Sequence, residues 1–260
     1  DASLLEATTQ LWRLSQLKTS LNATKQKDAE PTSKPLFMAI CLCIVDDLPH
    51  ADIWKHWIGN GENVSLYLHA KHPEKVAGEW TRSNLIGISH APNWNDVRIV
   101  KAMLSLAQEA LEDERVTHMY FGTESCLPIV SLQEALSRIQ DGVSYLKHYN
   151  KSQASRFEER TCWSPVEQYV PSEAIYKALP GWGVLCRAHV KAVLEMLPSL
   201  EFWKAFEFCW APEEVYFSTA LSLLGLLKQV QDKSLVYTEW NDRAQNETDR
   251  AHPLDFSSAF

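Results

Sequence analysis

The stretch Leu36-Phe37-Met38-Ala39-Ile40-Cys41-Leu42-Cys43-Ile44-Val45 decides the fold class of this chain of 260 residues. An unbroken apolar run is typical of a strand that is buried on both faces, as in the middle of a parallel sheet. A strand with one face in water would alternate apolar and polar residues instead. The stretch therefore predicts the first core strand of an α/β domain.

Strand-like and helix-like segments alternate after this first strand. The pattern predicts helices over residues 51–58 and 96–111 and strands over residues 64–69, 85–89 and 118–121. Such alternation indicates a mostly parallel sheet that is flanked by helices on both faces. Ligands of these sheets bind at the carboxyl ends of the strands. We therefore expect the loops at Asp46, His69 and residues 123–126 to share one crevice.

The rest of the chain extends this domain at both ends. Residues 4–21 carry leucines at near-helical spacing, and a polar stretch follows up to residue 34. We assign residues 1–34 to a peripheral helix and linker, and residues 35–260 to one catalytic domain. Its second half, with helices predicted over 188–197 and 213–227, is expected to form the other side of the same domain.

The charge and hydropathy of the chain exclude some classes of protein. A net charge of −8 argues against a nucleic-acid partner, because binding to phosphates requires an excess of Lys and Arg. The chain has no apolar run of the roughly 20 residues that span a bilayer. Because the sequence begins at Asp1, we expect a signal or membrane anchor upstream of it.

Cysteine and asparagine patterns point to a secretory compartment. The six cysteines have no CxxC spacing, which disfavours a zinc site and leaves disulfides open. Four glycosylation sequons begin at Asn22, Asn63, Asn150 and Asn246. Together these features favour a glycoprotein of the secretory pathway.

Common catalytic motifs are absent from the chain. It contains no P-loop, GxGxxG fingerprint, GxSxG elbow or HExxH helix. Asp46-Asp47 follows the first strand and is similar to the metal-binding DxD of many sugar-nucleotide enzymes, but its two aspartates are adjacent. A solvated loop is the alternative interpretation of this pair.

A series of short motifs runs in order through residues 35–256. They are Leu36 to Val45 with Pro49 and Trp54, Tyr67-Leu68-His69-Ala70, Trp94, Glu124-Ser125-Cys126-Leu127-Pro128, Gly181-Trp182-Gly183, Pro212-Glu213-Glu214-Val215-Tyr216-Phe217, and Trp240 to Arg243 with His252-Pro253. In this order they resemble the core-2/I-branching β-1,6-N-acetylglucosaminyltransferase family and its plant relatives, with xylosyltransferases as more distant relatives.

The resemblance implies an inverting glycosyltransferase of the Golgi with a single domain of the GT-A type. Its donor would be a UDP-sugar carrying GlcNAc or a related sugar, and its acceptor a hydroxyl of a glycan or glycoprotein. The implied reaction needs no metal and no cofactor. A carboxylate must take the proton of the acceptor hydroxyl as the bond forms, and the family's base maps to Glu214.

Each site residue has a structural alternative. Glu214 is either the base or a carboxylate that stabilises the start of a helix. The resemblance assigns Arg243 and Arg250 to the diphosphate, although either could be a surface residue. The candidates for sugar or nucleotide binding, and their alternatives, are Glu124 (or a loop brace), His69 (or a strand cap), and Trp94 and Trp182 (or core residues).

The chain also departs from the family pattern. Glu213 stands where the family has Asp, Val215 where it has His, and Lys71 where an acidic residue is frequent. No lysine matches that of the family's Lys-Gly-Ser-Gln-Trp-like segment around residues 179–182. These departures keep two alternatives open: an inactive fold that serves as a scaffold in a larger assembly, and a lectin-like module that binds glycans without UDP.

Overall fold

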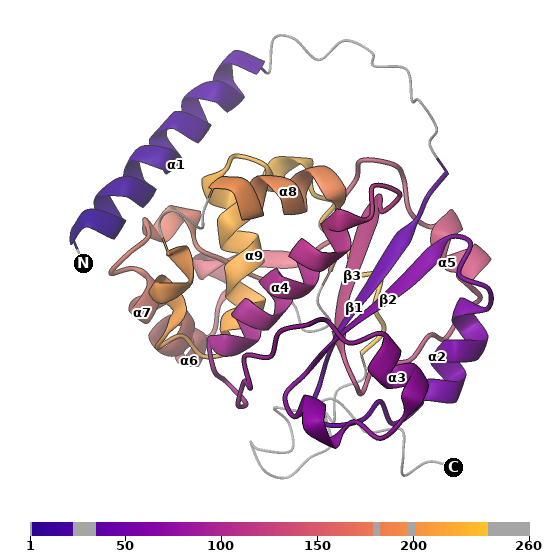
Figure 1. The fold of residues 1–260 in the computed structure, drawn as a ribbon. Helices are drawn as coiled ribbons and strands as arrows, with labels where there is room; N and C mark the ends of the chain where they lie inside the picture. Colours follow the sequence, from indigo (N-terminus) through magenta and orange to yellow (C-terminus); the bar gives the residue numbers. More distant parts are fainter. Residues whose placement is uncertain (1, 23–34, 179–182, 197–200, 239–260) are drawn as a thin grey trace.

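The computed structural model describes residues 2–22, 35–178, 183–196 and 201–238, with a four-stranded sheet between two groups of helices (Figure 1). The strand order is β2-β1-β3-β6. β1 (Met38–Ile44) pairs in parallel with β2 (Val64–Ala70) and with β3 (His118–Thr123). β6 (Val184–Cys186) runs antiparallel to β3. The predicted mostly parallel sheet is confirmed.

β1 occupies the middle of the sheet because both of its faces are apolar. Cys41 and Cys43 face one hydrophobic core, and the alternate residues Ile40 and Leu42 face the other. Every residue of the strand is buried. The continuous apolar run of the sequence is therefore needed to fill two cores at once.

Helices flank the two faces of the sheet. α4 (Arg98–Glu112), α8 (Arg187–Met196) and α9 (Pro212–Leu223) pack into the core on one face. α2 (Ala51–Ile58), α3 (Glu79–Ser83) and α5 (Leu132–Ser137) pack on the other, and Figure 1 shows the two groups on opposite sides of β1, β2 and β3. The arrangement agrees with the predicted α/β class and with a domain of the GT-A type.

A smaller sheet lies beside α9. β4 (His148–Asn150) and β5 (Tyr176–Ala178) are antiparallel, and the chain between them forms α6 (Arg156–Glu158), a π-helical turn (Glu159–Trp163) and α7 (Ser164–Val166). Three hydrogen bonds join β5 to α9. The hydroxyls of Ser218 and Thr219 donate to the Tyr176 carbonyl at 2.7 and 3.1 Å, and the Tyr176 N–H donates to the Thr219 hydroxyl at 3.2 Å.

The predicted peripheral helix is present as α1 (Ala2–Asn22). It is attached to the domain by the buried Leu4 and by Thr8, whose hydroxyl donates to the Tyr169 carbonyl at 2.5 Å. The predicted linker, residues 23–34, lies outside the described residues. Within the described ranges, no helix is long and apolar enough to cross a membrane.

Two predicted segments are wrong in extent. Residues 85–89 form no strand, because only Leu85 bridges to Leu68 of β2 before the chain leaves the sheet at Gly87. The last helix ends at Leu223 rather than at residue 227. Gly225 has a φ of 73°, a left-handed conformation that glycine adopts easily and that commonly ends a helix.

Candidate functional site

The first turn of α9 lies at the carboxyl ends of the parallel strands. The Phe217 ring contacts that of Phe121 on β3, with 5.3 Å between centroids. Burial raises the pKa of Cys43, near the end of β1, to about 12, and the charge of Glu213 adds to this shift. α9 thus brings Glu213 and Glu214 to the edge of the sheet where ligands of α/β folds bind.

Local sequence determines where α9 begins. Pro212 occupies the first helical turn, where its fixed φ suits the helix and its missing N–H costs nothing. Ala211 before it has a left-handed φ of 48°. Its N–H donates to the Asn95 side chain at 2.5 Å. This contact joins the start of α9 to the loop that precedes α4, and it offsets the strain at Ala211.

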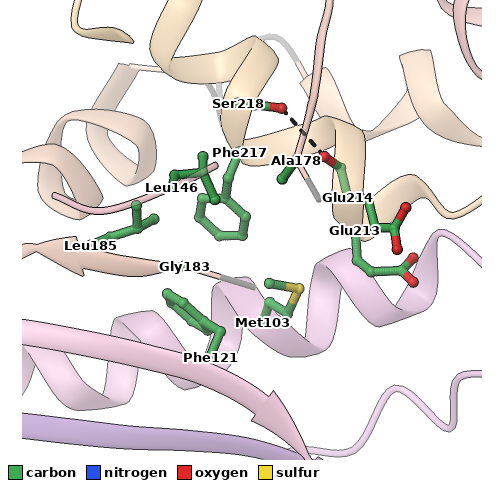
Figure 2. A pocket seen from close by; sticks show the side chains of 10 residues that line it. All are labelled: Met103, Phe121, Leu146, Ala178, Gly183, Leu185, Glu213, Glu214, Phe217 and Ser218. Carbon is green, nitrogen blue, oxygen red and sulfur yellow. Dashed lines mark hydrogen bonds between the residues drawn. The ribbon is translucent and has the colours of Figure 1, made fainter. Parts of the chain in front are cut away.

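The two carboxylates lie together at one end of a small pocket, with Phe121, Leu146 and Phe217 at its apolar end (Figure 2). The cavity volume is about 20 Å³, which holds about one water molecule. Glu213 Oε2 is buried and accepts no hydrogen bond from the described residues. This pocket is therefore polar at one end and too small, in this conformation, for a sugar ring.

A lysine from the small sheet joins the site. Lys177 Nζ of β5 lies 3.2 Å from Glu214 Oε2 and 3.0 Å from Glu158 Oε1 of α6. The Lys177 side chain is only 9% exposed, and that of Glu214 only 14%. Glu158 Oε1 also accepts a hydrogen bond of 2.5 Å from the Tyr149 hydroxyl. Segments far apart in sequence thus form one buried network around Glu214.

The two adjacent carboxylates have different electrostatic surroundings. Burial, with a further contribution from Glu214, raises the pKa of Glu213 to about 7. Burial also raises the pKa of Glu214, but Lys177 opposes that shift. Neighbouring acids with different surroundings are a common feature of sites that transfer protons. The first turn of α9 therefore holds two carboxylates whose ionisation is governed by different neighbours.

An aromatic cluster borders the start of α9. Trp94 is 69% exposed, and its ring contacts that of Trp210 edge to face, with 4.8 Å between the ring centroids. Trp210 makes a similar edge-to-face contact with Phe157, with 5.6 Å between the ring centroids. Trp94 is therefore not a core residue, and it lies beside the segment that leads into Glu213 and Glu214.

Glu124 and His69 lie at the predicted edge of the sheet, and both make structural contacts there. The Glu124 carboxylate accepts the Val45 N–H, as expected of a loop brace. His69 is fully buried, and its Nε2 accepts the His90 N–H at 3.0 Å. His69 thus holds the loop at His90 from inside the protein and presents no exposed surface to a nucleotide. A role of Glu124 in sugar binding stays a prediction.

Asp46-Asp47 also forms a loop. The Asp47 carboxylate accepts the N–H groups of Leu48, Ala77 and Gly78 at 2.7 to 3.0 Å. Asp46 Oδ1 lies 3.8 Å from Lys75 Nζ, at the surface. In the part of the chain that the structure describes, no group of three or more His, Cys, Asp or Glu side chains could hold a metal ion. The six cysteines are free thiols.

The remaining predicted site residues cannot be placed. Trp182, Arg243 and Arg250 lie outside the described residues. The structure instead adds Lys177 and Glu158, which the sequence did not single out. Lys177 stands just before residues 179–182, where the family lysine was sought, so its position near that segment is the one signal that could have found it.

Known proteins resemble this chain in the same region. Residues 39–259 match the family described as core-2/I-branching enzyme. A curated relative, "Glycosyltransferase BC10" of Oryza sativa subsp. japonica, is 22% identical over 223 residues. That alignment covers 74% of this chain and 54% of the relative. The chain thus spans about half the length of the curated relative it matches.

Proposed function

The chain belongs to the core-2/I-branching enzyme family, and from this premise we propose that it is an inverting glycosyltransferase with Glu214 as its general base. The donor is a UDP-sugar carrying GlcNAc or a related sugar, and the acceptor is a hydroxyl of a glycan or glycoprotein. The observation that carries the proposal is the placement of the Glu214 carboxylate, mostly buried and paired with Lys177, at the carboxyl edge of the sheet.

The proposed reaction proceeds by one displacement. Glu214 takes the proton of the acceptor hydroxyl while that oxygen attacks the anomeric carbon, and UDP departs from the opposite face. Arg243 and Arg250 stabilise the departing diphosphate, because a guanidinium can bind two phosphate oxygens at once. Glu124 binds sugar hydroxyls, and Trp94 and Trp182 stack on sugar rings. No metal ion takes part in this scheme.

We place the protein in the lumen of the Golgi, as the catalytic part of a type II membrane protein. The sequons at Asn22, Asn63, Asn150 and Asn246 support a secretory location. An oxidising compartment permits disulfides, so the proposal includes them although all six cysteines are free thiols in this structure.

Glu214→Gln provides the direct test. Transfer is measured as UDP release from UDP-GlcNAc, UDP-xylose and UDP-glucuronate in the presence of glycan acceptors. Loss of a general base costs on the order of a hundredfold or more in rate. The matched control is Glu213→Gln, because Gln resembles the protonated form, which a pKa of about 7 leaves substantially populated at neutral pH. We expect a much smaller loss for this variant. Full turnover by Glu214→Gln would exclude Glu214 as the base.

A catalytically inactive scaffold is the second candidate function. The small cavity beside Glu214 favours it, since about 20 Å³ cannot hold a sugar ring. Binding of UDP separates the two candidates, because a ligand of the native state raises the melting temperature in proportion to the logarithm of its concentration over Kd. A transferase is stabilised by millimolar UDP, whereas a scaffold without a nucleotide site shows no shift.

A further inference from the structure

Lys177 lies beside the proposed base but has no role in the reaction described above. Its side chain is buried, and its ammonium group lies within 3.2 Å of two carboxylates that come from different elements, Glu158 of α6 and Glu214 of α9. A buried cation is costly unless it is paired. Its presence here is explained by the negative charge of these two groups.

The backbone fixes Lys177 opposite Glu214. The three hydrogen bonds that join β5 to α9 are all made by Tyr176, the residue before Lys177, with Ser218 and Thr219. Ser218 is one helical turn after Glu214, and its hydroxyl also lies 3.3 Å from the Glu214 carbonyl. The lysine and the carboxylate are therefore presented by two elements that cannot move apart without breaking these bonds.

Glu158 is itself held rigidly. Its Oε2 accepts the N–H and the hydroxyl of Ser155 at 2.8 and 2.9 Å, and its Oε1 accepts the Tyr149 hydroxyl. These hydrogen bonds and Lys177 outweigh burial and lower the pKa of Glu158 to about 2. Glu158 is therefore a permanent anion, and it anchors the far side of the Lys177 ammonium group.

We propose that Lys177 is a positioning residue for the base: anchored by Glu158, it holds the Glu214 carboxylate in one orientation and keeps it ionised. This inference rests on the proposed function for its catalytic meaning. The contact itself is independent of the reaction. A base must be unprotonated before it can accept the acceptor proton, and an opposite charge at this distance lowers the pKa of a carboxylate by about one to three units.

The other charged groups near Glu214 act in the opposite direction. Glu158 and burial both raise the pKa of Glu214. Glu213 lies on the same turn, and the charge of Glu214 raises the pKa of Glu213. The titratable groups Tyr149 of β4, Cys162 of the π-helical turn and Cys209 before α9 also interact with Lys177. Among these described neighbours, Lys177 supplies the positive charge, so its removal should raise the pKa of Glu214.

The test compares Lys177→Met, Lys177→Arg and Glu158→Gln in the full chain. The pKa of Glu214 is followed by NMR of protein labelled with ¹³C at the glutamate carboxyl carbons, and the Glu214 signal is assigned by its loss in Glu214→Gln. This readout requires neither donor nor activity. The pH profile of kcat/KM for transfer is measured beside it.

Three results are expected. Lys177→Met raises the pKa of Glu214 by about one unit or more and moves the acid limb of kcat/KM upward by the same amount. Lys177→Arg keeps both near their wild-type values. Glu158→Gln lowers both, because the anion that opposes ionisation of Glu214 is removed. A purely structural lysine would instead lower kcat/KM by one factor at every pH.

The inference and the proposed function fail in different ways. An unchanged pKa of Glu214 in Lys177→Met overturns the inference, whatever the activity. If Lys177→Met does not fold, Lys177→Gln, which also removes the charge, is measured in its place, and an unchanged pKa of Glu214 in that variant overturns the inference. Full transfer by Glu214→Gln overturns the proposed base, and it does so even when the NMR shifts appear as expected.

Discussion

The edge of the parallel sheet and the first turn of α9 lie close together but treat their polar groups differently. At the sheet edge, Asp47, Glu124 and Nε2 of His69 accept backbone N–H groups, although His69 Nδ1 has no hydrogen-bond partner among the described residues. At the start of α9, Glu214 pairs with a buried lysine and Glu213 keeps a buried oxygen without a hydrogen bond from the described residues. The sheet-edge acceptors thus hold loops in place, whereas the acids at the start of α9 lie where burial and neighbouring charges shift their pKa values, which is common at functional sites.

The pH dependence of stability should show this difference, with opposite signs in the two regions. At the start of α9, the pKa of Glu213 is raised to about 7 by burial and by Glu214. A raised acid pKa means that the native state binds more protons than the unfolded state between about pH 4.5 and 7. The stabilising contribution of Glu213 is therefore complete below pH 4.5 and is lost as pH rises through 7.

Glu213→Gln should remove this loss and has the largest expected effect. The free energy of unfolding of the variant should exceed that of wild type by up to about 3 kcal/mol at pH 8 to 9, since one pKa unit corresponds to about 1.4 kcal/mol. The difference should vanish below pH 4.5. Urea unfolding at a series of pH values measures both free energies. A constant difference across this range would show that Glu213 does not titrate as inferred.

His69→Gln tests the sheet edge and should give the opposite slope. Burial, with a smaller contribution from His90, lowers the pKa of His69 to about 4. The unfolded state therefore binds more protons between about pH 4 and 6.5, and wild type loses stability as pH falls through this window. Gln retains an acceptor for the His90 N–H but cannot become charged.

We expect wild type to lose about 2 to 3 kcal/mol more than His69→Gln between pH 6.5 and pH 4. Urea unfolding at these two pH values is the measurement. His118→Gln is a suitable comparison for the pH slope. His118 is also buried, and burial also lowers its pKa, but it is the first residue of β3 and so lies at the other edge of the sheet. If the free energy of unfolding changed equally with pH in wild type and in His69→Gln, His69 would not have the lowered pKa inferred here.

The same difference explains what could be predicted from the sequence. The central strands and α4 follow from local patterns, because a run such as residues 36–45 has to be buried on both faces wherever it lies. The start of α9 was predictable from Pro212 and the two glutamates. Residues 85–89 have the composition of a strand, yet only Leu85 bridges to β2, which composition alone does not reveal.

The network around Glu214 could not be predicted in this way. Lys177 and Glu158 are 19 residues apart in the chain, and both are remote from Glu214 in sequence. These three residues come from α6, β5 and α9, and the sequence does not indicate that these elements pack together. Conversely, Glu124 and His69 were singled out because they follow strands, but residues at strand ends often bind the adjacent backbone. Position at the sheet edge was predictable, whereas the partner of each side chain was not.

Asp47→Ala has the smallest expected effect and completes the comparison. The variant removes the acceptor of three backbone N–H groups. Because the loop is partly exposed, water replaces part of each lost hydrogen bond, and we expect a cost of about 1 to 2 kcal/mol in the free energy of unfolding. The loss should grow as pH rises above the pKa of Asp47, which the Gly78 N–H and the other donors hold below its usual value. Urea unfolding at pH 7 and pH 3 measures this dependence. Transfer by the folded variant should stay within a fewfold of wild type, because the Asp47 carboxylate binds the backbone of its own loop and of residues 77 and 78, away from Glu214 and Lys177. A loss of transfer as large as that of Glu214→Gln, in a variant that remains folded, would place the sheet edge within the catalytic machinery and remove the distinction between the two regions.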